Sequence, residues 1–269
     1  MLASGMTVAA IGWRAHGALL ASGGAARVVA PLSTSFYAEA AGELIWIGGA
    51  GTPLHGRAVV HANPPSARAH GSVYVAIDDA IPWRPIPLGT PLPGISDAAR
   101  ALLTRLPSVG EPRGLGRLLG TGGDDDLVVI RARPYAEVIG AACAADDAAA
   151  MAEAARALLG LGPGLTPSGD DYVGGVLFGR RLRAHGNAAA WDAAVASVLT
   201  DATTLTHAIS SCLLADLAAG EGWAPLHDLA AALVAGAGDD ALSAARAVTS
   251  LGHTSGWDLF AGFMTALAR

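Results

Sequence analysis

The sequence contains no lysine, because all 17 of its basic residues are arginines. A pyridoxal-phosphate Schiff base, a P-loop phosphate lysine and every other lysine-dependent reaction are therefore excluded. Acidic residues outnumber basic ones, and the formal net charge is -6. We expect no nucleic-acid partner, since the phosphates of a nucleic acid would be repelled by this surface.

Cysteines and long apolar runs are also scarce. The two cysteines, Cys143 and Cys212, form no CxxC motif and predict no disulfide framework. No uninterrupted apolar stretch reaches about 18 residues, and the first residues carry no basic segment before a short apolar run. We therefore expect no membrane partner, no signal peptide and a cytoplasmic location.

Aromatic residues make up only 5% of the chain, although 52% of it is hydrophobic. Alanine, valine and leucine supply most of the remainder, which is typical of closely packed helices. A chain of 269 residues is long enough for one large domain or two modest ones. It can also bury a core without disulfides or metals, since about 75% of the unfolded-chain surface is buried at this size.

The first third of the chain has the pattern of a β-rich domain. Short segments such as "TVAAIGW", "ALLAS", "ARVVAPL", "ELIWIG", "AVVH" and "SVYVAID" are rich in valine, isoleucine or aromatics and are separated by glycine, serine and proline. This spacing predicts a small antiparallel barrel or sandwich. The segment 81–94 carries five prolines and predicts a domain boundary or linker without regular structure.

From Ser96 onward the pattern becomes helical, with one brief strand expected at "DLVVIRA". Ser96 or Asp97 is a suitable N-cap for the first of these helices. Seven more helices are expected near 145–159, 169–185, 188–201, 206–219, 225–236, 239–250 and 256–268. The order of strands followed by helices predicts an α+β protein, with a β-rich domain at 1–94 and a mainly α-helical domain at 95–269.

The segment "GPGLTPSGDD", residues 162–171, has the pattern of a helix start with more polar groups than a connecting loop needs. Ser168 followed by Asp171 resembles a capping box, and first-turn aspartates suit the helix dipole. One interpretation is a well-capped helix after a rigid turn. The other is a binding site in which backbone N–H groups and hydroxyls hold an anion while the aspartates hold a cation. Because free carboxylates repel an anion, this site would need Mg²⁺ between them.

The segment "LGHTSGWDLFAGF", residues 251–263, repeats the same pattern of S-G-x-D-x-x-x-G. Ser168, Gly169, Asp171 and Gly175 match Ser255, Gly256, Asp258 and Gly262 position for position. Two such helix starts could face each other across one pocket, or the repetition could be chance in a glycine-rich chain.

A third segment, residues 201–222, groups threonines, His207 and serines at a helix start. At helical spacing Thr203, Thr206, His207 and Ser210 share one face. This polar face predicts either ordinary capping or a third wall of the same pocket. Three arginines are candidate anion ligands, with Arg156 better placed than Arg180 and Arg181, which we expect to meet solvent.

These patterns together give one set of candidate site residues. The candidate catalytic residues are Asp170, Asp171 and Asp258, and Asp170 and Asp171 are also the candidate magnesium ligands. The candidate ligand-binding residues are Gly162, Gly164, Thr166, Ser168, Gly169, Thr204, His207, Thr254, Ser255 and Gly256.

The motifs "GLGPGLTPSGDD" and "LGHTSGWD", with a threonine- and serine-rich helix start between them, resemble the AllH family. The resemblance is most specific over Leu158–Asp171 and Leu251–Gly262. It implies a subunit of an oxamate carbamoyltransferase, which exchanges a carbamoyl group between oxalurate and phosphate during allantoin and purine-nitrogen breakdown. It also implies two partner subunits, one of them similar to an acyl-CoA synthetase.

The resemblance implies no catalytic residue, so the site residues above depend on the sequence pattern alone. The ligands it implies, carbamoyl phosphate, phosphate or an oxalurate-like acid, are anionic. The S-x-R-T phosphate loop of the aspartate and ornithine carbamoyltransferases is absent. An alternative function is a non-catalytic binding or assembly subunit, in which the glycines serve helix packing. A third is an independent metal-dependent enzyme acting on another small acid or amide.

Overall fold

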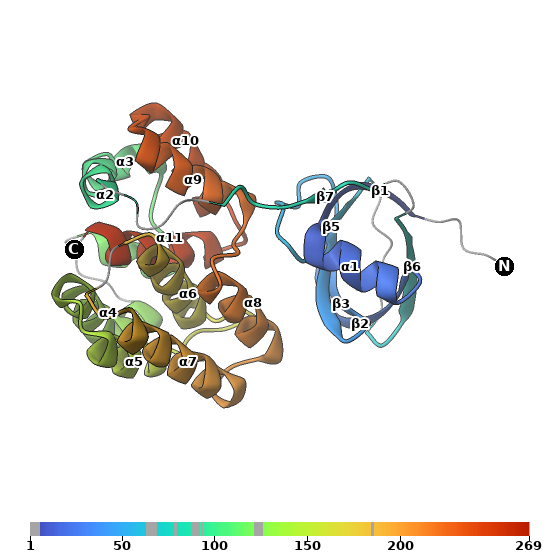
Figure 1. Ribbon diagram of the computed structural model, residues 1–269, viewed down its shortest axis with the longest axis horizontal. Coiled ribbons are helices and arrows are strands. Elements are labelled where there is room, and N and C mark those ends of the chain that lie inside the picture. The colour runs from blue at the N-terminus through green and yellow to red at the C-terminus, as the bar shows by residue number, and fades with distance from the viewer. Residues whose placement is uncertain are drawn as a thin grey trace. The chain divides into compact units, whose positions relative to one another are not determined.

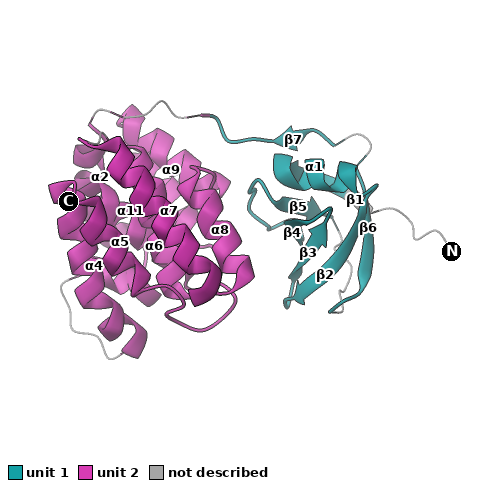
Figure 2. Ribbon diagram, turned by 60° about the horizontal axis from the view of Figure 1, so that its bottom comes forward, with its two compact units in different colours: residues 1–86 teal, residues 87–269 magenta. Residues whose placement is uncertain are grey.

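The chain divides into two compact units, Met1–Ile86 and Pro87–Arg269 (Figure 2). The computed structural model describes residues 6–62, 69–77, 80–87, 92, 94–120, 126–183 and 186–268. The first unit contains a β-sheet and one helix, and the second is built of helices. The predicted α+β class is confirmed.

The first unit is a mixed, curled sheet with strand order β5-β4-β3-β2-β6-β1-β7 and an additional β5–β1 pairing. The strands are β1 (Met6–Gly12), β2 (Ala25–Pro31), β3 (Ser35–Ala40), β4 (Glu43–Gly48), β5 (Ala58–His61), β6 (Ser72–Ala76) and β7 (Pro82–Trp83). Strand β1 runs parallel to β6 and β7, and β4 runs parallel to β5. The predicted antiparallel barrel or sandwich is therefore only a half-barrel with mixed pairing. Local spacing indicates strands, but strand direction depends on how the connecting segments return the chain.

Helix α1 (Trp13–Ala21) packs against β3 and β4. It includes the segment "ALLAS", so the strand predicted there is wrong. Its buried residues Ala15, Ala18 and Leu19 lie at helical spacing on one face and join the core of the sheet. The segment 81–94 also contains one short regular element, because Pro82 and Trp83 pair with the end of β1.

The second unit packs its helices around a central pair, α6 and α11 (Figure 1). The elements are α2 (Ile95–Thr104), α3 (Leu106–Val109), the 3₁₀ helix η1 (Gly114–Leu119), α4 (Leu127–Ala145), α5 (Ala148–Arg156), α6 (Ser168–Arg181), α7 (Ala188–Leu205), α8 (Ala208–Ala218), α9 (Ala224–Ala235), α10 (Gly238–Thr249) and α11 (Ser255–Ala268). The last seven agree with the predicted helices to within a few residues. Among the described residues, no helix is long and apolar enough to cross a membrane.

Helices α6 and α11 are buried on every side, and they approach each other through glycines. A Cβ atom added at Gly175 would lie 2.1 Å from the carbonyl oxygen of Leu259. A Cβ atom added at Gly262 would lie 1.8 Å from the carbonyl oxygen of Tyr172. The two matched glycines therefore allow backbone-to-backbone contact, which explains why a buried helix keeps residues that weaken an isolated one.

Three local predictions in this unit are corrected by the structure. The strand expected at "DLVVIRA" is the first part of α4, whose N-cap Asp126 accepts a hydrogen bond from the Val128 amide at 2.8 Å. The cap and the buried helical face override the strand preference of the valines. Helix α2 has Gly94 as its N-cap rather than Ser96 or Asp97. Helix α6 has Pro167 at its N-cap, so Ser168 is the first helical residue rather than the cap.

We predict that Gly262→Ala destabilises the helical unit. The added methyl group cannot be accommodated against the Tyr172 carbonyl without moving backbone, and overpacking of this kind costs about 1–3 kcal/mol. The free energy of unfolding in urea measures the loss. Gly17→Ala in α1 is the matched control, because a Cβ there meets nothing within 4 Å. Equal unfolding free energies for the Gly262→Ala variant and the parent protein would contradict the close packing described above.

Candidate functional site

The starts of α6 and α11 lie side by side, and their matched residues bond across to each other. The hydroxyl oxygens of Thr166 and Ser255 are 3.3 Å apart. Asp171 of α6 accepts hydrogen bonds from the hydroxyls of Ser255 and Thr166. Asp258 of α11 accepts a hydrogen bond from Ser168. We call the four residues Ser168, Asp171, Ser255 and Asp258 the crossed pairs, since each serine serves the aspartate of the other helix.

Glycines beside the serines bring the preceding loops close to these helix starts. The Gly169 amide donates to the Leu161 carbonyl at 2.8 Å, and the Gly256 amide donates to the Leu251 carbonyl at 2.9 Å. A Cβ at Gly169 would lie 1.9 Å from the Leu158 carbonyl, so a larger residue would push that loop away. The two helix starts are thus built in the same way from the same residue types.

Asp171 is buried, with 5% of its surface exposed. Burial raises the pKa of its carboxyl group well above the ordinary value, and the neighbouring charges of Asp258 and Asp170 raise it further. The hydrogen bonds from Ser255 and Thr166 oppose this effect. The Oδ2 atom of Asp171 is shielded from solvent and has no hydrogen-bond partner among the described residues.

Asp258 is completely buried and has a richer set of donors. Its Oδ1 accepts the Leu115 amide of η1 at 2.6 Å, and Ser168 and Thr254 also donate to the carboxyl group. Burial nevertheless raises the pKa of Asp258 to about 6. Its Oδ2, like that of Asp171, has no partner within the described part of the chain. The site therefore combines two buried carboxyl groups, each with one oxygen left for a ligand or a proton.

Asp170 belongs to a different environment from Asp171. Its Oδ1 accepts the Gly160 amide at 2.7 Å, and its Oδ2 accepts the hydroxyls of Thr206 and Ser210, the latter at 2.6 Å. These bonds tie the start of α6 to α8 and to the turn after α5. Among the described residues, no group of three or more His, Cys, Asp and Glu side chains could hold a metal ion.

The other candidate residues divide into those near the crossed pairs and those away from them. Gly162 lies against Ser168, since a Cβ there would be 2.9 Å from the Ser168 amide nitrogen. Gly164 is exposed, with nothing within 4 Å of an added Cβ. Thr204 and His207 are also exposed, and the Thr204 hydroxyl donates to the Asp201 carbonyl at 3.1 Å. The predicted polar face at 203–210 is interrupted, because α7 ends at Leu205 and α8 begins at Ala208.

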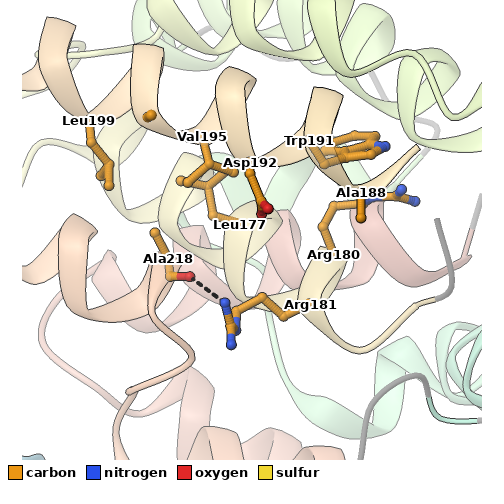
Figure 3. A pocket seen from close by; sticks show the side chains of 10 residues that line it. Leu177, Arg180, Arg181, Ala188, Trp191, Asp192, Val195, Leu199 and Ala218 are labelled. Carbon is orange, nitrogen blue, oxygen red and sulfur yellow. Dashed lines mark hydrogen bonds between the residues drawn. The ribbon is translucent and has the colours of Figure 1, made fainter. Parts of the chain in front are cut away.

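The candidate arginines are engaged elsewhere. Arg156 pairs with Asp201 at 2.7 Å. Arg180 was expected to meet solvent, but it is only 3% exposed: it bonds Asp146 at 2.7 Å and lies 3.9 Å from the centre of the Trp191 ring. Arg180 and Trp191 line a pocket of about 340 Å³ beside α7 (Figure 3). In the same pocket Arg181 donates a hydrogen bond to the Ala218 carbonyl at 3.2 Å.

Sequence reasoning missed the contribution of η1. The Leu115 amide of this short helix donates a hydrogen bond to Asp258. Gly114 has a φ of +48°, and a Cβ there would lie 2.4 Å from the Asp258 Oδ1. The glycine was a signal of close approach, but its partner is 144 residues away in the sequence (258 − 114). Gly160, whose amide donates to Asp170 ten residues later, was also missed.

We predict that Asp258→Asn is most stabilising at neutral pH. The pKa of Asp258 is about 6 in the folded protein, against an ordinary value of 3.8. Between these two pH values the folded protein keeps a proton that the unfolded chain releases. The free energy of unfolding therefore falls as the pH rises through this window. Asparagine cannot ionise. Its benefit should therefore be greater near pH 7 than near pH 4 by roughly 2 kcal/mol, measured as the free energy of unfolding.

Asp192→Asn on the exposed surface of α7 is the control for the loss of one carboxylate. An Asp258→Asn effect that is the same at both pH values would show that the Asp258 carboxyl group does not keep its proton on folding.

The family model described as "Oxamate carbamoyltransferase subunit AllH" matches residues 158–267. The matched segment begins just before the first helix start and ends within α11, so it includes all four residues of the crossed pairs. No curated protein and no solved structure matches the chain. Over residues 158–267, which carry both helix starts of the candidate site, the chain is similar to the AllH family.

Proposed function

We propose that the chain is a subunit of an oxamate-carbamoyltransferase-type enzyme of the cytoplasm. The enzyme would transfer a carbamoyl group between an oxalurate-like acid and phosphate in purine and allantoin nitrogen breakdown. Other subunits would complete it, one of them similar to an acyl-CoA synthetase. The family match over residues 158–267 supports the subunit assignment. The observation that carries a role in the reaction is the Oδ2 atom on each buried aspartate of the crossed pairs, which has no hydrogen-bond partner among the described residues.

The two carboxyl groups suit an amide-bearing substrate. The strongly raised pKa of Asp171 favours its protonated form, which can donate a hydrogen bond to a carbonyl or phosphate oxygen. The pKa of Asp258, about 6, leaves this group mostly ionised near neutral pH, so it can accept a hydrogen bond from a carbamoyl N–H. One donor and one acceptor side by side complement the C=O and N–H of a carbamoyl group.

Serine and threonine hydroxyls and backbone amides supply the remaining polar groups. The first turns of α6 and α11 offer N–H groups in an environment that favours negative charge, which suits the phosphate or carboxylate of the substrate. Both Oδ2 atoms are shielded from solvent. The proposal therefore requires the glycine-containing segments 160–167 or 250–254 to move when the substrate enters.

We propose Asp170 as a positioning residue rather than a ligand of magnesium. Its two oxygens already accept three hydrogen bonds, from Gly160, Thr206 and Ser210. A cation would displace these donors before it could bind. Asp171 and Asp258 are the carboxylates that keep an oxygen for Mg²⁺, and a magnesium titration of the purified subunit would test them.

We predict that Asp171→Asn abolishes activity in the assembled complex without unfolding the subunit. Asparagine keeps the size of the side chain and an acceptor for Ser255, but it cannot supply the acidic proton. Loss of one donor to the developing negative charge costs about 10²–10³-fold in rate, measured here as kcat for carbamoyl phosphate formation. The exposed variant Asp192→Asn should retain full activity. An Asp171→Asn complex as active as the parent would rule out this site.

A second candidate function, a non-catalytic assembly subunit, is favoured by two observations. The glycines of α6 and α11 are explained by helix packing alone. Helix α4 also exposes apolar side chains at helical spacing, with Leu127 68%, Ile130 48% and Val138 47% exposed. Exposed apolar residues aligned on one helix face suit burial against another protein. In this function the other subunits of the complex would cover α4.

We predict for this alternative that Ile130→Glu prevents co-purification with the other subunits, because a buried charge would oppose the interface. Ala193→Glu, on the exposed face of α7, is the matched control and should leave the complex intact. A complex that assembles normally with Ile130→Glu would remove α4 as the assembly surface.

A further inference from the structure

A second cavity in the helical unit lies outside the crossed pairs. It has a volume of about 370 Å³ and is lined by residues of α2, η1, α4, α6 and α11. None of the crossed-pair residues lines it. Its walls are apolar at Leu103, Leu118, Leu119 and Met264, and polar at Arg133, Glu137, Tyr172 and Thr265. The volume is within the range of small-molecule sites, and the lining exposes more polar than apolar surface.

Arg133 is the unusual member of this lining. Its Nη2 atom is shielded from solvent and has no hydrogen-bond partner among the described residues. A shielded guanidinium nitrogen without an acceptor is costly, because the charged group loses water and gains nothing in return. Other arginines of the unit avoid this cost through ion pairs, such as Arg105 with Asp239 and Arg180 with Asp146.

The nearest expected partner of Arg133 is Glu137, one helical turn later on α4. Arginine and glutamate four residues apart commonly form an ion pair on a helix surface. In the described structure the two side chains form no salt bridge, although both line the cavity. The cavity therefore presents one positive and one negative group that do not neutralise each other.

The far wall adds a fixed pair of hydroxyls. Tyr172 of α6 donates a hydrogen bond to the Thr265 Oγ1 of α11 at 3.0 Å. Both residues are almost fully buried, at 1% and 8% exposure, so the pair is held rigidly against the central helices. The apolar side chains of Leu103, Leu118 and Met264 complete the enclosure.

We propose that this cavity binds a small zwitterion with an apolar side chain, of the class of the aliphatic α-amino acids. The carboxylate would bind the guanidinium of Arg133, which can donate two parallel hydrogen bonds to it. The ammonium group would face the Glu137 carboxylate, and the aliphatic part would pack against Leu118 and Met264. The proposal is independent of the carbamoyl-transfer function, because it concerns other residues and is tested by binding alone.

The test is calorimetric titration of the full chain with leucine, 4-methylpentanoate and 3-methylbutylamine. Leucine carries both charges, and each of the other two probes lacks one of them. We expect leucine to bind at least tenfold more tightly than either control probe, since both Arg133 and Glu137 are then satisfied. Failure of leucine to bind, or equal affinity for leucine and 4-methylpentanoate, would overturn the proposal.

Substitutions on α4 locate the binding. Arg133→Met keeps the side-chain length without the charge and should weaken leucine binding at least tenfold. Arg131→Met, on the exposed face of the same helix, should leave the affinity unchanged. Glu137→Gln lies at an exposed position, so it keeps the fold even where Arg133→Met does not. It should remove the preference for leucine over 4-methylpentanoate.

The two sites are separated by Asp171→Asn, which should bind leucine as tightly as the parent protein. Leucine binding that is lost in Asp171→Asn and kept in Arg133→Met would place the ligand at the crossed pairs and overturn the assignment of the cavity. Loss of carbamoyl transfer in Asp171→Asn with unchanged leucine binding would support both sites independently.

Discussion

The close approach of α6 and α11 is the constraint on which the helical unit depends. Gly175 and Gly262 let the two backbones touch, and this contact fixes how the helices are aligned along each other. With that alignment set, the first turn of each helix brings its serine to the aspartate of the other. A side chain at either glycine would separate the helices and also disrupt the hydrogen bonds at their starts. The packing of the two helices and the geometry of the candidate site therefore both depend on the glycine contact.

Burial of charge is the cost of this arrangement. Burial raises the pKa of both carboxyl groups, because a low-dielectric interior disfavours the ionised form. Hydroxyls and one backbone amide offset part of this cost, but each aspartate keeps one oxygen that has no partner among the described residues. Arg133 shows the same deficit with the opposite charge. Unsatisfied buried groups of this kind are uncommon in folded proteins and tend to mark places where a ligand or proton completes the site.

The helices of the second unit and the matched helix starts could be predicted because both depend on local pattern, namely apolar spacing and the repeated S-G-x-D motif. Asp170 and Asp171 could not be told apart in this way. Consecutive helical residues point about 100° apart, so only the packed structure shows that one faces Thr206 and Ser210 while the other faces Ser255. The mixed pairing of the sheet and the bond from Leu115 to Asp258 were likewise beyond local reasoning, since both are set by segments distant in the sequence.

The amide of Leu115 makes the two helix starts unequal. Each aspartate receives one serine hydroxyl from the opposite helix and one threonine hydroxyl from its own side, so the two carboxyl groups would otherwise be near copies of each other. Only Asp258 receives the additional N–H from η1, a segment outside the residues that match the family. A repeated pattern alone would give two similar acids. The donor from η1 lowers the pKa of Asp258, while the charges of Asp258 and Asp170 raise the pKa of Asp171, so one stronger acid and one weaker acid share the same buried space.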